Sequence, residues 1–124
     1  MIIKKTKFKD LLIVKQKNNS DKRGSLRETF NDKILKKKFI FEYCTTSKKN
    51  VFRGFHFQLK NKQSKFITVL KGRILDVVID LRKNSKTFGE VFNIGTIFAS
   101  YFEGKKIRGT YTYYPSTYHC NMRS

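Results

Sequence analysis

The sequence has little proline and little glycine, with one and seven of these residues in a chain of 124. Disordered segments and flexible linkers are rich in both, so the composition excludes a low-complexity chain. Hydrophobic residues make up 39% of the sequence, and twelve phenylalanines and six tyrosines can fill a core. A chain of this length is typical of one domain. We therefore expect a single globular domain over residues 1–124.

Cysteines are also scarce. Cys44 and Cys120 are the only two, and neither belongs to a CxxC or a paired Cys/His spacing. This pattern excludes a disulfide framework and a zinc site. The first twenty residues contain no apolar run long enough for a signal peptide or a membrane span. We expect a cytoplasmic protein with reduced thiols and no membrane contact.

Acidic residues are few: nine face 28 basic residues, which gives a net charge of +19. A field of that sign attracts polyanions, and nucleic acid is the first such partner to consider. The basic residues are spread along the chain in short runs such as Lys36-Lys37-Lys38. A lysine-rich solvated surface explains most of this charge.

Aromatic and β-branched residues dominate the remaining sequence, which is the composition of strands. One hairpin is predicted from "FITVL" (66–70) and "RILDVVIDL" (73–81), joined by a turn at Lys71-Gly72. Four further strands are predicted at 39–43, 52–59, 90–102 and 109–115, together with a short helix at 31–38. Short strands separated by turn signals indicate an all-β barrel or sandwich.

Alternation assigns faces within the second half of that hairpin. Leu75, Val77, Ile79 and Leu81 form a wholly apolar side, which we expect to face a core. The other side is mixed, and its residues are Ile74, Asp76, Val78 and Asp80. We interpret the two aspartates as scaffold residues.

His56 is the first candidate for chemistry, because imidazole is the commonest general base near neutral pH. Along the strand His56, Gln58 and Lys60 share a polar face, and the other face carries phenylalanines and a leucine. Arg53 lies three residues before His56, so the two lie on opposite faces unless Gly54 introduces a bulge. In a barrel the polar face can line an interior pocket.

Five linked motifs occur in order along residues 8–94. They are "DKRGSLRETF" (21–30), "RGFHFQ" (53–58), "QSK" (63–65), "GRILDVVIDLR" (72–82) and "SKTFG" (85–89). This set resembles the dTDP-4-dehydrorhamnose 3,5-epimerase family. The resemblance implies a cupin-type, double-sheet (jelly-roll) β-barrel that is a homodimer and needs no metal or cofactor.

The resemblance also implies a substrate, a dTDP-linked 4-keto-6-deoxysugar, and residue roles. His56 takes the position of the proton-abstracting base, and Lys65 that of a lysine stabilising the enolate. The implied substrate-binding residues are Arg23, Glu28, Arg53 and Gln58, the first two reaching across the dimer in some members. Reprotonation from the opposite face would then invert the carbon beside the ketone.

The likeness ends near Ile94, and residues 95–124 diverge. Gly109, Pro115 and His119 resemble the second cupin motif, which makes His119 a further substrate-binding candidate. No aspartate follows Asp80 to orient the base, and the barrel is expected to be incomplete at its C-terminal end. Two alternatives stay open: an inactive relative that only binds nucleotide sugar, and a basic nucleic-acid-binding β-barrel whose aromatic residues stack on bases.

Overall fold

The computed structural model describes residues 1–36, 38–57, 60, 63–96, 99–102 and 110–123, with side chains up to residue 95. These residues form an eight-stranded sheet, a separate two-stranded hairpin and one short helix. The elements are β1 (Ile2–Lys5), β2 (Leu11–Lys15), β3 (Asn18–Asp21), β4 (Gly24–Arg27), α1 (Asp32–Leu35), β5 (Phe41–Ser47), β6 (Val51–His56), β7 (Lys65–Ile79), β8 (Val91–Thr96), β9 (Ala99–Phe102) and β10 (Thr110–Arg123).

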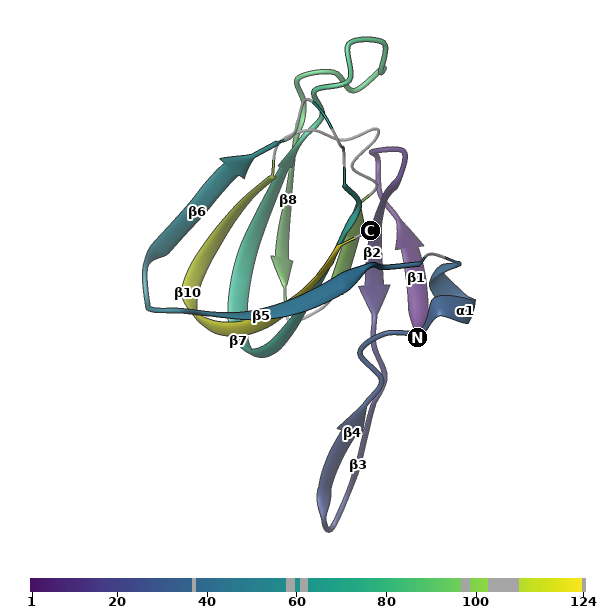
Figure 1. Cartoon of the computed structure of the whole chain (residues 1–124), viewed down its shortest axis with the longest axis vertical. Coiled ribbons are helices and arrows are strands. Elements are labelled where there is room, and N and C mark those ends of the chain that lie inside the picture. Colours follow the sequence, from purple (N-terminus) through teal and green to yellow (C-terminus); the bar gives the residue numbers. More distant parts are fainter. Residues whose placement is uncertain (37, 58–59, 61–62, 97–98, 103–109, 124) are drawn as a thin grey trace.

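Two long strands form the centre of the sheet. β10 pairs with β7 on one side, and with β5 and then β6 on the other. β7 also pairs with β8 and β9, and β9 continues the sheet through β2 to β1. All of these pairings are antiparallel. In Figure 1, β7 and β10 bend through the lower part of the body, so that the sheet curls over on itself.

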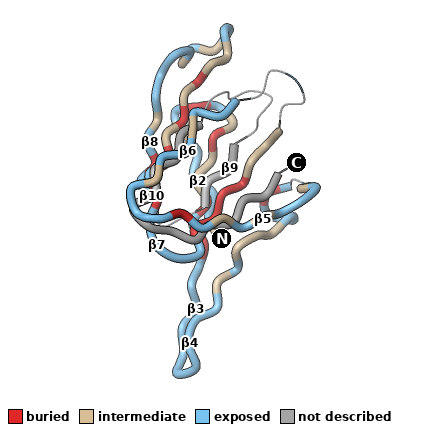
Figure 2. The backbone as a smooth tube through the Cα atoms, turned by 60° about the vertical axis from the view of Figure 1, so that its left-hand side comes forward, coloured by how far each residue is buried: buried red, intermediate tan, exposed pale blue. Residues whose placement is uncertain are grey.

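The curl encloses the main core. Ile67 and Val69, from the first half of β7, pack in one cluster with Ile74 and Val78 from its second half. Phe8, Leu11 and Ile94 complete this cluster, and in Figure 2 most buried segments lie along the strands of the curled body. The side of the sheet that carries these residues is called the inner face below. The fold is thus the expected all-β, cupin-type barrel.

A second, smaller core lies on the other side of β2. Val14, Leu35 and Phe66 are its buried members, and Phe30 and Phe39 pack against it with their rings edge-on to one another. The helix α1 supplies Leu35. Its N-terminus is capped by Asn31, whose side chain accepts a hydrogen bond from the Ile34 amide at 3.2 Å. This helix covers a smaller span than the predicted 31–38.

The hairpin expected at 66–81 is absent, because both halves belong to the single strand β7. Gly72 has a φ of 90°, which only glycine adopts easily, and it lies in the bend of β7. β10 pairs with β7 on both sides of this glycine, with register shifts between 113 and 116 and between 118 and 119. The glycine therefore bends a continuous strand, and the partner strand lies some forty residues downstream.

The expected faces of β7 are also reversed. Ile74, Asp76, Val78 and Asp80 are buried, whereas Leu75 is 37% exposed. The mixed side faces the core because register is set by long-range pairing, and a shift of one residue exchanges the two faces. The sequence alternation located the faces of this strand but did not identify the inner one.

Other strand predictions need smaller corrections. Residues 90–102 contain two strands, since β8 pairs with the second half of β7 and β9 with its first half and with β2. The strand at 39–43 is shifted to β5, and the one at 109–115 extends into β10. The strands β1 to β4 were not predicted. Among the described helices none is long and apolar enough to cross a membrane.

The hairpin of β3 and β4 projects from the body at the lower end of Figure 1 and is exposed along most of its length in Figure 2. Its base is anchored by polar contacts. Arg27 donates from Nη2 to the Val69 carbonyl oxygen at 2.9 Å, and the buried Gln16 donates to the Thr29 carbonyl oxygen at 2.6 Å. The hairpin therefore has a fixed origin on the barrel, and its strands are exposed along most of their length.

Candidate active site

A bulge in β6 aligns two of the expected site residues. His56 pairs with position 110 of β10 and Arg53 with position 112, so three residue steps on β6 face two on β10. Gly54, between them, has a φ of 143°, a region that favours glycine. Because positions 110 and 112 lie on one face of β10, the pairing brings Arg53 and His56 onto one face as well. The sequence left this possibility open, and the structure adopts it.

That face is the inner face. On the other side of β10, position 110 pairs with Val78 and position 112 with Asp76, and both side chains are fully buried. Val51, two residues before Arg53, packs against the main core. Arg53 donates from Nε to the buried Ser47 hydroxyl at 3.1 Å. The two residues thus belong to the concave side of the curled sheet.

Lys65 starts β7 on the same inner face. It is two residues from Ile67 and four from Val69, and both of these pack in the main core. Along a flat strand, Lys65 would lie about 43 Å from Val78, the position level with His56. The connection from residue 56 to residue 65 spans at most about 32 Å, so the two ends must approach each other. In Figure 1 the end of β6 and the start of β7 both lie toward the upper end of the curled sheet, which is called the open end below.

The candidate base and cation differ in exposure. His56 is exposed and Lys65 is half-buried, while the residues of the main core are closed to solvent. The phenylalanines beside His56 do not cover it: Phe55 and Phe57 are themselves about half exposed. An imidazole in this position is accessible to a ligand. Among the described residues no cluster of His, Cys, Asp or Glu could hold a metal ion.

Two expected residues cannot be placed fully. Gln58 lies outside the described residues. His119 lies on β10, where its backbone pairs with Thr45 and Val69, but its side chain is outside the described part of the chain. Both assignments stay predictions.

Arg23 and Glu28 are not brought to the open end of their own chain. Arg23 follows β3 in the projecting turn, with its side chain 89% exposed, and contacts Asp21 at 2.5 Å. Hydrogen bonds from Arg23 hold the pKa of the Asp21 carboxyl below its usual value. Glu28 follows β4 and accepts a hydrogen bond from the Asn31 side-chain amide at 2.8 Å. In Figure 1 this hairpin and the end of β6 are at opposite ends of the molecule.

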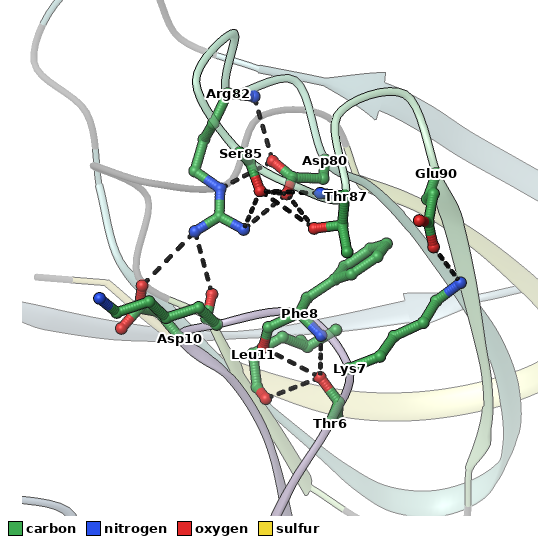
Figure 3. A network of polar contacts seen from close by, with 11 residues as sticks. Thr6, Lys7, Phe8, Asp10, Leu11, Asp80, Arg82, Ser85, Thr87 and Glu90 are labelled. Atoms are coloured by element: carbon green, nitrogen blue, oxygen red, sulfur yellow. Dashed lines mark hydrogen bonds and ion pairs between the residues drawn. The ribbon is translucent and has the colours of Figure 1, made fainter.

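Four of the motif residues build a loop instead of a binding site. The buried Asp80 accepts hydrogen bonds from Arg82 Nε at 2.7 Å, and from the hydroxyls of Ser85 and Thr87 at 2.6 Å each. Arg82 also contacts Asp10 at 3.6 Å (Figure 3). The scaffold role expected for Asp80 agrees with this network. No motif pointed to Asp10, which lies 70 residues before Asp80 in the chain.

The network fixes the charge of Asp80. Burial alone would raise the pKa of this carboxyl, but the hydrogen bonds from Arg82, Ser85 and Thr87 together hold it far below its usual range. The same contact with Asp80 raises the pKa of the Arg82 guanidinium. The loop between β7 and β8 is therefore closed by a charged pair.

Comparison with known proteins agrees with this geometry. The family model for dTDP-4-dehydrorhamnose 3,5-epimerase matches residues 5–96. The chain belongs to the dTDP-4-dehydrorhamnose 3,5-epimerase family. The match covers β2 to β8, and it therefore includes the bulge at Gly54, Lys65 and the Asp80 loop.

Individual relatives agree with this family assignment. The epimerase of Methanothermobacter thermautotrophicus is 40% identical over 91 residues, which are 69% of this chain and 49% of that protein. The crystal structure of the Bacillus anthracis epimerase with TDP and PPi bound superposes with a TM-score of 0.86 at 27% identity. It matches 98% of this chain, and this chain covers 76% of it. A Legionella pneumophila epimerase in complex with dTDP-4-keto-L-rhamnose gives a TM-score of 0.84 at 25% identity, covering 98% of this chain and 70% of that one.

The chain spans about half the length of the epimerase sequences it matches. The likeness in sequence ends near residue 96, whereas the likeness in structure extends over almost the whole chain. The described strands after β8, which are β9 and β10, therefore follow the epimerase fold although the family match in sequence does not reach them.

Gly54 is expected to be essential for the alignment. Replacing it with alanine places a Cβ at a φ of 143°, where such a residue is strained by about 1–3 kcal/mol. We expect Gly54→Ala to lower the free energy of unfolding by that amount. Urea denaturation followed by circular dichroism measures the change. Gly95→Ala is the matched control, because a Cβ at Gly95 meets no atom within 4 Å; equal losses in both variants would contradict the role of the bulge.

Proposed function

We propose that this chain epimerises a dTDP-linked 4-keto-6-deoxysugar at carbons beside its ketone, the reaction that leads to dTDP-L-rhamnose. The observation that carries the proposal is the bulge at Gly54, which brings Arg53 and His56 to the inner face that also carries Lys65. The relatives support the substrate class, since one is bound to TDP and another to dTDP-4-keto-L-rhamnose.

The reaction needs three kinds of group. A base removes the proton on a carbon next to the ketone, a cation stabilises the negative charge that develops on the ketone oxygen, and an acid returns a proton to the other face. His56 takes the role of the base, since its imidazole is exposed at the open end. Lys65 takes the role of the cation. Arg53 binds the anionic substrate, because a guanidinium matches phosphate oxygens with paired donors.

Arg23 and Glu28 act in a neighbouring chain under this proposal. The projecting hairpin holds them away from the inner face of their own chain, and a symmetric dimer would allow each hairpin to reach the partner's site. Gln58 and His119 are assigned to substrate binding from the sequence motifs alone.

A mixing experiment tests the shared site. Arg23→Ala and His56→Ala chains are each expected to be inactive, and random pairing of the two should recover about a quarter of the wild-type rate in mixed dimers. In such a dimer, one site has both residues intact. The rate is measured after the two variants are unfolded and refolded together. No recovery, with mixed dimers demonstrated by mass spectrometry, would assign Arg23 and His56 to one chain or to no common site.

The direct test is solvent deuterium exchange. The wild-type chain is incubated with dTDP-4-keto-6-deoxyglucose in D₂O, and NMR follows deuterium at the carbons flanking the ketone. Exchange supports the proposed reaction. Binding of the sugar nucleotide without exchange identifies an inactive relative, and salt-dependent oligonucleotide binding that is unchanged in Arg53→Ala identifies a nucleic-acid-binding barrel instead.

A further inference from the structure

The only two cysteines of the chain, 76 positions apart, are placed directly opposite each other. β5 and β10 pair over seven consecutive rungs without a bulge, from Ser47 opposite Thr117 to Phe41 opposite Arg123. Within this run Cys44 pairs with Cys120. A register shift between β5 and β10 at this rung would also displace the three rungs on either side of it. The continuous register therefore holds Cys44 opposite Cys120.

Cross-strand geometry suits a disulfide. Residues directly opposite in an antiparallel pair have Cα atoms about 4.5–5.5 Å apart and project to the same side of the sheet. Disulfides need a Cα separation of about 4.4–6.8 Å. The backbone register alone therefore satisfies the main requirement for a bridge between these positions. In the structure Cys44 is a free thiol.

The thiol of Cys44 is also accessible. Cys44 is exposed, and β5 is the last strand in the order β1-β2-β9-β7-β10-β5, so it forms an edge of the sheet. Its exposed neighbours on the same side of β5 are Glu42 and Thr46. A small oxidant can reach Cys44 without opening the core.

We propose that Cys44 and Cys120 form an intrachain disulfide when the protein meets a low-molecular-weight disulfide. The Cys44 thiolate attacks that disulfide, forms a mixed disulfide and releases one thiol. The second cysteine then attacks the Cys44 sulfur, forms the S–S bond and releases the second thiol. The external disulfide accepts the two electrons, and each cysteine proton passes through solvent to a released thiolate.

The bridge would fix the strand on which the candidate site depends. β10 is the strand that aligns Arg53 and His56 with Val78 on the inner face, and its later half contains the cysteine rung. A covalent link to β5 closes a long loop and removes freedom from the unfolded chain. Oxidation therefore stabilises the pairing of β10 whether or not the chain is an active epimerase.

The test uses the full chain and oxidised glutathione. In the oxidised protein, peptide mapping under non-reducing conditions should find residues 44 and 120 in one linked peptide. The melting temperature should rise by at least about 5 °C and fall again on reduction. Two free thiols after oxidation, or linkage only between separate chains, would overturn the proposal.

A matched variant tests the register itself. The double variant Cys44→Ser, Thr46→Cys keeps one exposed thiol on the same side of β5 but moves it two residues from the rung. The Cα atom of the new cysteine at position 46 is then about 7–8 Å from the Cα atom of Cys120, beyond the reach of an unstrained bridge. We expect intrachain bridging at least about tenfold slower than in the wild type. If the wild type and the double variant have equal circular dichroism spectra and form the intrachain bridge at equal rates, Cys44 does not lie directly opposite Cys120.

Discussion

Under the proposed function, replacing His56 with alanine is expected to slow deuterium exchange into the keto sugar by about 10²–10⁴-fold, the usual contribution of a general base. The exposed imidazole should contribute little to stability, because it lies at the open end of the sheet and outside both cores. Binding of dTDP and the melting temperature should therefore change little. Exchange is measured by NMR, and binding by calorimetric titration.

Lys60→Ala is the control for this variant. Lys60 is exposed and lies beyond the end of β6 at His56, so the strand face predicted to join the two residues does not reach it. No motif assigns Lys60 a role, and its removal tests the loss of a nearby positive charge alone. We expect exchange at close to the wild-type rate. If His56→Ala retains most of the exchange rate, or if Lys60→Ala loses it equally, His56 is not the base.

Replacing Asp80 with alanine is expected to lower the free energy of unfolding by about 3–5 kcal/mol, because it leaves Arg82 without its buried partner. The Asp80 side chain is fully buried and the Arg82 side chain is 17% exposed, so solvent screens this pair only weakly. The hydroxyls of Ser85 and Thr87 lose their acceptor as well. Urea unfolding followed by circular dichroism measures the change.

The ion pair of Lys7 and Glu90 is the control. Its atoms are 2.6 Å apart, but its side chains are almost half exposed. Glu90→Ala should therefore change stability by less than about 1 kcal/mol. Similar losses for Asp80→Ala and Glu90→Ala would show that burial of the Asp80 pair has no special importance.

The same network predicts a pH dependence. The pKa of Asp80 is far lower in the folded chain than its unfolded value of about 3.9. Its ionised form therefore contributes stability that is complete above about pH 5 and is lost as the pH falls below 4 toward the folded pKa. Asp80→Asn cannot lose this term, so its stability should fall less steeply from pH 5 to pH 3. Parallel curves would contradict the low pKa.

Some features of the fold could be predicted from the sequence and others could not. The strands β6, β8 and β10 carry aromatic and β-branched residues, and each was located at least in part. The strands β1 and β3 read "IIKK" and "NNSD", and a strand in such polar segments is decided by pairing with a neighbour. Gly72 has the same chemistry in a turn and in a bent strand, so only the pairing with β10 distinguishes them.

The candidate site was also predicted only in part: its residues could be named from the motifs, but their relative positions could not. The motifs singled out Arg53, His56 and Lys65, but regular alternation placed Arg53 and His56 on opposite faces. The bulge at Gly54 reversed that relation. The motifs also grouped Arg23 with these residues, whereas the structure holds it exposed in the hairpin of β3 and β4, which projects from the lower end of the molecule in Figure 1.

The sequence by itself determined the all-β class, the epimerase family and the residue types available for chemistry, because these depend on composition and on linked local motifs. Only the tertiary structure decided which side of each strand faces inward, where the sheet curls and which residues meet. The physical reason is that side chains alternate between the two faces of a strand, so one added residue turns a side chain to the other face. Pairing with distant strands sets the register and therefore decides which face is the inner one.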